Sequence, residues 1–257
     1  MSAPPRLSCR DLAVAIAGRT LAAKLDLDVR AGEIWAIVGP NGAGKTTLLA
    51  TLAGLRPAAA GRIAYDGDDI GALSSRERAL RRGYLPQDSV DTFPATVQEI
   101  VLAGRHPHLP RWRWEGRDDV ERARDALAAL DLAGLESRDV RTLSGGERRR
   151  VALAALLAQD PGLLLLDEPS THLDPGRQVE AMDRLVALAR DRGKAIVMVV
   201  HELHLALRAA DHAIAMGDGG ACAGTADEVL NERALSGLFR HPLVAVGSGT
   251  TRTLLPR

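Results

Sequence analysis

Apolar and polar residues alternate near the start of the chain. Residues 7–16 and 21–29 each show part of a two-residue period, clearest at 25–29, and a short turn-like segment at 17–19 separates them. A period of two is typical of strands with one buried and one solvated face. This region therefore predicts an antiparallel pair of strands.

Three later runs are largely apolar instead of alternating. They are EIWAIV at 33–38, LLLL at 163–166 and AIVMVV at 195–200. Short continuous apolar runs are typical of strands covered on both faces, as in a parallel sheet. Each run is followed by residues of distinct chemistry: a glycine-rich loop, an acid pair and a histidine.

Residues 88–160 carry little strand signal and favour helices instead. The helical stretches expected there are 97–102, 118–130 and 147–159. The whole chain, 1–257, is thus expected to form one α/β domain. Its α/β core comprises residues 1–87 and 161–257, and residues 88–160 form an inserted helical subdomain.

Charge and cysteine content narrow the function classes. The 33 basic and 33 acidic residues cancel, so overall charge does not point to nucleic acid or to an anionic membrane. Cys9 and Cys222 provide no disulfide framework or metal cluster and suit a reducing cytosol. No run approaches the ~18 apolar residues of a membrane span, and the first residues lack the apolar run of a signal peptide.

The segment after the first buried run matches the phosphate-loop pattern of glycine, four residues, glycine, lysine and then serine or threonine. Its glycines let backbone N–H groups surround phosphate oxygens, and the helix that follows adds its positive end. The lysine can reach the β- and γ-phosphates, and the first threonine can bind Mg²⁺. The expected nucleotide-binding residues are Gly39, Pro40, Asn41, Gly42, Ala43, Gly44, Lys45, Thr46 and Thr47.

Polar residues follow three further strand-like segments. Asp167 and Glu168 come directly after the four leucines, where ionised carboxylates need a cation or water as partner. His201 ends the run at 195–200, and Gln87 ends a short segment at 83–87. Taken singly, the acid pair could be structural, the histidine a satisfied strand end and the glutamine an exposed loop residue. Beside a triphosphate loop, we expect Asp167 to orient Mg²⁺ and Glu168 to face a water.

The sequence LSGGE at 143–147 opens a helix. Ser144 as N-cap with Glu147 reaching back would form a capping box. Two glycines in the first turn weaken a helix, and three arginines at 148–150 place positive charge at its positive end. We therefore expect an anion site here, which is compatible with the capping role.

Together these motifs resemble the ATP-binding-cassette (ABC) family, in order and spacing, over nearly the whole chain. The LSGGE element carries most of the specificity. The resemblance implies a RecA-like P-loop NTPase core with an N-terminal antiparallel β region and an inserted helical subdomain. It also implies an ATPase that uses ATP and Mg²⁺ and works as a homodimer with two shared sites.

The resemblance assigns roles residue by residue. Lys45 and the loop amides hold phosphates, and Thr46, Asp167 and Gln87 serve the Mg²⁺ ion. Glu168 polarises the attacking water and His201 contacts the γ-phosphate, so that Glu168, His201 and Gln87 are the catalytic group. The residues expected to reach the opposite subunit's nucleotide are Ser144, Gly145, Gly146 and Glu147, and Asp174 lies in a loop that crosses the dimer interface.

Two features refine this resemblance. The family usually stacks an aromatic residue on adenine, and here the corresponding residue is Ile16. The stretch at 102–108, LAGRHPH, resembles ATPases that serve iron-siderophore, haem and cobalamin importers. His106 and His108 are expected at the surface and not as metal ligands.

The resemblance implies the cytoplasmic ATPase subunit of an importer. It would lie on the inner face of the plasma membrane beneath integral membrane permease subunits, and indirectly serve a periplasmic substrate-binding protein, with no nucleic-acid partner. An exporter ATPase and a soluble non-transport ABC ATPase remain as alternatives. Trp112 and Trp114 lie in a loop rich in arginine and histidine, where they could dock the permease or pin the helical insertion to the core.

Overall fold

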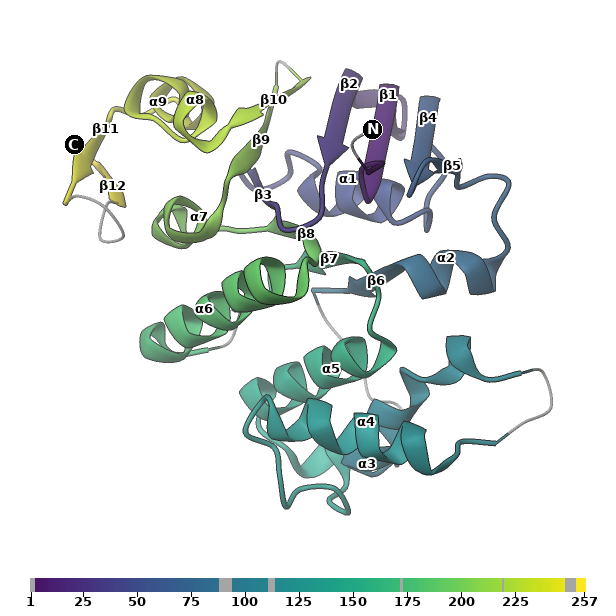
Figure 1. Cartoon of the computed structure of the whole chain (residues 1–257). Coiled ribbons are helices and arrows are strands. Elements are labelled where there is room, and N and C mark those ends of the chain that lie inside the picture. The colour runs from purple at the N-terminus through teal and green to yellow at the C-terminus, as the bar shows by residue number, and fades with distance from the viewer. Residues whose placement is uncertain (1–2, 88–93, 111–113, 172, 219, 248–252) are drawn as a thin grey trace.

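The central sheet is mainly parallel, as the continuous apolar runs predict. The computed structural model describes residues 3–87, 94–110, 114–171, 173–218, 220–247 and 253–257 (Figure 1). The sheet has the strand order β10-β9-β3-β8-β7-β6, and only β9 and β10 pair antiparallel. Its strands are β3 (Ile34–Val38), β6 (Arg82–Leu85), β7 (Leu163–Asp167), β8 (Ala195–Val199), β9 (His212–Gly217) and β10 (Gly220–Thr225).

Helices cover both faces of this sheet. Every residue of β3, β7 and β8 is buried. Alternate residues contribute to two separate apolar clusters, so that Leu164 packs in one and Leu165 in the other. On one face, α1 (Lys45–Leu52) contacts β7, β8 and the N-terminal strand β1 (Leu7–Ile16). The other face is covered by α6 (Pro175–Arg192) and α7 (Leu203–Ala209).

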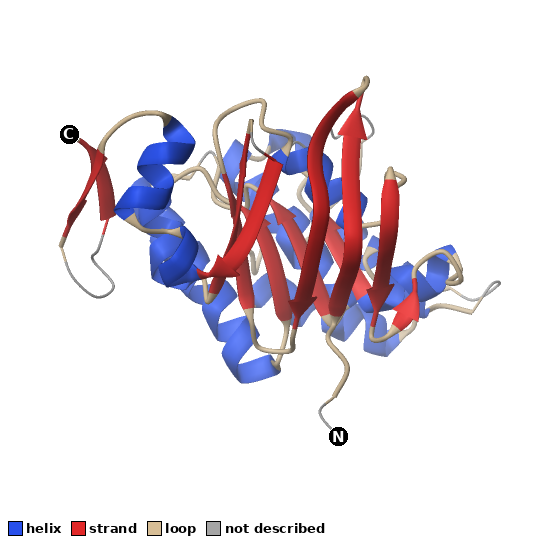
Figure 2. Ribbon diagram, turned by 90° about the horizontal axis from the view of Figure 1, so that it is seen from above, coloured by secondary structure: helices blue, strands red, loops and turns tan. Residues whose placement is uncertain are grey.

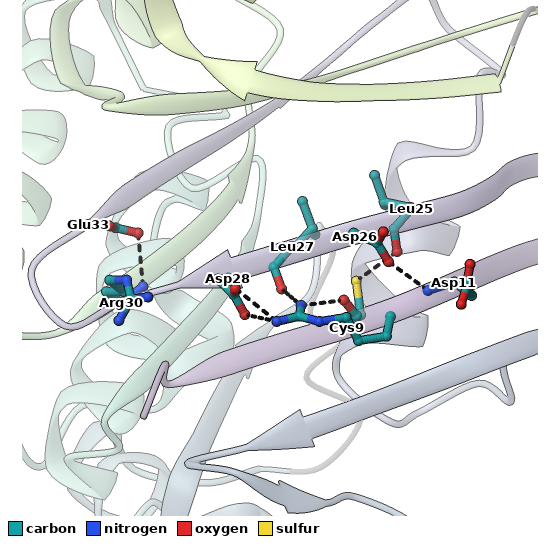
Figure 3. A network of polar contacts seen from close by, with 9 residues as sticks. Cys9, Asp11, Leu25, Asp26, Leu27, Asp28, Arg30 and Glu33 are labelled. Atoms are coloured by element: carbon teal, nitrogen blue, oxygen red, sulfur yellow. Dashed lines mark hydrogen bonds and ion pairs between the residues drawn. The ribbon is translucent and has the colours of Figure 1, made fainter. Parts of the chain in front are cut away.

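The alternating N-terminal segments form the predicted antiparallel sheet. Its order is β2-β1-β4-β5, and Figure 2 shows its long strands beside the central sheet. A short register break in β1 lies at Asp11, whose backbone has a φ of 49°. The Asp26 carboxylate accepts a hydrogen bond of 2.7 Å from the backbone N–H of Asp11 at this break (Figure 3). The strands are β1 (Leu7–Ile16), β2 (Arg19–Val29), β4 (Ala60–Tyr65) and β5 (Asp68–Asp69).

On this sheet, Arg10 of β1 forms hydrogen bonds and an ion pair to β2. Arg10 donates to the Leu27 carbonyl at 2.9 Å and to both oxygens of Asp28 at 2.8 Å (Figure 3). Beneath it, the buried Cys9 thiol donates to the Leu25 carbonyl, and burial raises the pKa of that thiol to about 12. Cys9 is therefore an inert core residue.

The predicted helical stretches form a group of their own below the sheet in Figure 1. They are α3 (Val97–Ala103), α4 (Arg117–Ala128) and α5 (Gly145–Gln159), which contact one another, and α5 also contacts β6. Within the described ranges, no helix has both the length and the apolar character that crossing a bilayer requires. The remaining elements are α2 (Ser75–Arg81), η1 (His106–His108), η2 (Val140–Thr142), α8 (Ala226–Val229), α9 (Glu232–Phe239), β11 (Leu243–Val246) and β12 (Thr253–Pro256).

Candidate nucleotide site

Four neighbouring parallel strands, β3, β8, β7 and β6, end at one edge of the central sheet. The glycine loop, His201, the acid pair and Gln87 follow these strands directly, so the topology brings the predicted residues together. Most of them border a cavity of about 680 Å³, but the fully buried Asp167 is not among its lining residues. Its lining residues are Ile16, Arg19, Leu21, Asn41, Gly42, Gly44, Lys45, Thr46, Thr47, Gln87, Glu168 and His201.

The glycine loop adopts a backbone that other residues would distort. Gly39 has a φ of 153°, and a Cβ there would lie 2.1 Å from the Met216 carbonyl oxygen. Gly44 has a φ of 96° and caps α1 without a side chain. The first amides of α1 consequently remain available to a ligand at the positive end of the helix.

Lys45 is folded back onto its own loop. Its side chain is buried, and Nζ donates to the carbonyls of Gly39 at 2.8 Å and Pro40 at 3.1 Å. Burial lowers the pKa of the Lys45 amine, while the charges of Glu168 and Asp167 act in the opposite direction. The amine is thus positioned behind the loop amides, where phosphate oxygens can compete for its protons.

Asp167 is a fully buried acid whose carboxylate oxygens have no hydrogen-bond partner among the described residues. Burial raises the pKa of the Asp167 carboxyl, and the nearby Thr46 hydroxyl opposes that shift. Because a buried, unpaired carboxylate is costly and oxygen ligands suit Mg²⁺, the donor set fits that ion.

Glu168 is held in place on both of its oxygens. His201 Nε2 lies 2.6 Å from Oε1, and the Thr171 hydroxyl donates to Oε2 at 2.9 Å. The backbone of Glu168 has a φ of 50°, a strained conformation of the kind found at functional sites. Sequence reasoning missed Thr171, because a threonine three residues after an acid gives no distinctive signal.

The arginines at 148–150 were expected to contribute to an anion site, and Arg149 is placed differently. Its guanidinium is buried and donates to the carbonyls of Gln87 at 3.1 Å and Glu168 at 2.8 Å. It also donates to the carbonyls of Pro86 and Asp167. Arg149 therefore holds the backbone segments at Gln87 and Glu168 together and does not line an anion site.

The start of α5 has the predicted capping box, but it does not line the nucleotide cavity. Ser144 and Glu147 form a reciprocal capping box, with distances of 3.2 Å and 2.8 Å. Ser144 and Gly145 are exposed, while Arg150 donates to the Leu130 carbonyl. Within the described chain, neither this helix start nor Asp174, the exposed N-cap of α6, lies among the residues that line the cavity.

The loop between α3 and α4 contains the histidines and Trp114. His108 Nε2 lies 2.8 Å from the Gln159 carbonyl, and His106 lies 3.5 Å from Glu115. Trp114 is 88% exposed, so the alternative that it pins the helical insertion to the core is wrong. Trp112 lies outside the described residues.

Comparison with known proteins gives a consistent result. The sequence profile described as ABC transporter matches residues 22–171. The ferric enterobactin transport ATP-binding protein FepC of Escherichia coli K12 is 37% identical, covering 91% of this chain and 87% of that protein. The hemin import ATP-binding protein HmuV of Streptomyces coelicolor is 41% identical, covering 95% of this chain and 86% of that protein.

A solved structure supports the same assignment. An inward-facing transporter described as of the metal-chelate ABC type superposes with a TM-score of 0.86. It is 26% identical, and the match covers 98% of this chain and 97% of that one. The chain therefore belongs to the ABC transporter family and is one of its ATP-binding ATPases.

Proposed function

We propose that the chain is the ATP-hydrolysing subunit that powers import of a metal chelate, namely an iron-siderophore, haem or cobalamin, through a partner permease. The observation that carries this proposal is its similarity, over most of both chains, to ATP-binding proteins named for ferric enterobactin and hemin. No feature of the described chain favours an exporter or a soluble ABC ATPase instead.

The site suggests how the chain's own residues divide the work. The loop at 39–47 binds the phosphates through its available backbone N–H groups and the Lys45 amine, and Ile16 contacts the base. Glu168, oriented by His201 and Thr171, takes or positions the proton of the attacking water. His201 lines the same cavity and would contact the γ-phosphate.

The residues present also fit a magnesium ion. Thr46, Asp167 and Gln87 would hold it, and the ion would supply charge stabilisation on the transferring phosphoryl group. Support comes from the unpaired oxygens of the Asp167 carboxylate. Arg149 contributes indirectly, because it donates to the backbone carbonyl of Gln87 itself and to that of Glu168, the residue after Asp167.

The exposed start of α5 supports a homodimer. Ser144, Gly145, Gly146 and Glu147 would reach the nucleotide of the opposite subunit, and Asp174 would lie at the dimer interface. In this arrangement, residues 1–87 and 161–257 form the α/β core and residues 88–160 the helical subdomain. Hydrolysis would then depend on closure of the two subunits.

The exposed Trp114 supports a contact with the permease. Tryptophan is enriched at interface hot spots, and this one is 88% exposed beside the helical group. Docked there, the subunit would lie on the cytoplasmic face of the inner membrane. A periplasmic substrate-binding protein would deliver the chelate from the other side.

Uptake by the native host tests the proposal. Cells lacking this chain should lose accumulation of labelled ferric siderophore, haem or cobalamin, and the wild-type chain should restore it. Complementation with the chain carrying Trp114→Ala should restore uptake poorly, while the purified variant keeps its melting temperature. Normal uptake of all three chelates in the deleted cells would overturn the import function.

A further inference from the structure

The base-binding end of the nucleotide cavity has an unusual surface. Ile16 is 40% exposed and lines the cavity where the family usually places an aromatic ring. An aliphatic side chain covers one part of a base but lacks the flat face that stacking needs. A second group at this end could therefore contribute to binding.

Arg19 lies where it can contribute to binding of the base. It begins β2 directly after the tight turn from β1, and its antiparallel partner across the hairpin is Ile16. Directly opposed residues of an antiparallel pair project from the same face of the sheet, with Cβ atoms about 5 Å apart. Both residues line the cavity, so together they offer one surface to the nucleotide.

An ion pair orients the Arg19 side chain. Its Nη2 lies 3.1 Å from Asp218 Oδ1, and Arg240 Nη2 lies 2.7 Å from the other oxygen of the same carboxylate. The Arg19 side chain is still 57% exposed, so the ion pair leaves much of it accessible to a ligand. Asp218 and Arg240 line a neighbouring cavity and not the nucleotide cavity, whereas Arg19 lies between the two and lines both.

We infer that Arg19 is a nucleotide-binding residue that recognises the base, with its guanidinium plane lying against the purine beside Ile16. A planar guanidinium stacks on aromatic faces as an ammonium does not. The contact would partly replace the missing aromatic stack. It requires that the site binds ATP, as family membership establishes, and is independent of the imported cargo.

Equilibrium binding to the purified chain tests the inference. Arg19→Ala should weaken ATP binding about fivefold, the effect of a partly exposed cation–π contact. Binding of inorganic tripolyphosphate, which has no base, should stay unchanged. Arg240→Ala is the matched control, because it removes an ion pair with the same Asp218 carboxylate, and it should leave ATP affinity unchanged.

A conservative variant separates stacking from simple charge. Arg19→Lys keeps the positive charge but loses the plane, so it should bind ATP nearly as weakly as Arg19→Ala. The inference is overturned if Arg19→Lys restores full affinity, or if Arg19→Ala weakens tripolyphosphate and ATP equally. It is also overturned if Arg19→Ala binds ATP normally, or if Arg240→Ala weakens ATP binding as much.

Discussion

The two ends of the nucleotide cavity are built differently. At the phosphate end, Lys45, Asp167 and Glu168 are buried. The loop before Lys45 follows a path that requires glycine at positions 39 and 44, and the Arg149 guanidinium binds the Glu168 carbonyl. At the base end, Ile16 and Arg19 lie at a hairpin turn and are largely exposed. The first end is rigid by construction, whereas the second rests on one exposed ion pair.

On the proposed assignment, this difference follows from what each end would do. Phosphoryl transfer depends on positioning and charge stabilisation, so small displacements at the phosphate end are costly. The base end would contribute to binding and not to the chemical step. Replacing one contact there by another should therefore change affinity only modestly. Variants at the phosphate end should therefore alter turnover or stability, and variants at the base end should alter affinity.

The largest effect is expected at Glu168. Glu168→Gln keeps the size of the side chain and can still bond to Thr171, but it cannot accept a proton. Turnover should fall at least about a hundredfold, the usual contribution of a general base, while ATP binding is retained. Steady-state phosphate release together with equilibrium ATP binding measures both quantities.

A neighbouring acid provides the control for that variant. Glu202→Gln changes the same functional group one residue after His201, at the N-cap of α7, and should leave turnover nearly unchanged. Turnover close to wild type in Glu168→Gln would contradict the assignment of Glu168 as the group that activates water.

A smaller effect is expected on stability at Asp167. Its carboxyl pKa is raised above 3.8 by burial, so ionisation in the folded state opposes folding. The penalty is absent below that unfolded value, grows as pH rises from there to the folded pKa, and stays constant above it. Without nucleotide or Mg²⁺, Asp167→Asn should melt about 2–4 °C higher at pH 8, corresponding to ~1 kcal/mol in a chain of this size.

Two further measurements sharpen the Asp167 prediction. The difference in melting temperature should shrink as the pH is lowered from 8 towards the unfolded value of 3.8, because the wild-type carboxyl becomes protonated. Adding Mg²⁺ with ATP should stabilise the wild type more than the variant. A variant that is less stable than the wild type at pH 8 would contradict this account of the buried carboxylate.

The sequence predicts that the residues of the proposed phosphate end lie at one edge of the sheet, because they belong to contiguous motifs. The glycine loop and the acid pair each follow a buried strand, so the strand pattern places them at one edge of a sheet. Likewise, Ser144 and Glu147 form their capping box from local spacing alone. In each case, the information lies within a few residues of the feature.

Contacts between distant segments could not be predicted in the same way. Arg149 was expected near an anion, yet its carbonyl partners come from segments that lie 62 and 19 residues away in the chain. Arg19 meets Asp218 across 199 residues, and no local pattern marks either partner. Such pairings depend on how the sheets and α5 pack together.

The smallest effect is expected at the base end, from restoring an aromatic ring. Ile16→Tyr should lower the Kd for ATP about fivefold, because a base–aromatic stack contributes ~1–3 kcal/mol and part of that is already supplied by existing contacts. The affinity for tripolyphosphate and the maximal turnover should not change, since the phosphate end is untouched. If the ring and the Arg19 guanidinium contact the same base, Arg19→Ala should weaken ATP binding less in the Ile16→Tyr background than in the wild type. Strictly additive effects would show that the two side chains act on different parts of the nucleotide.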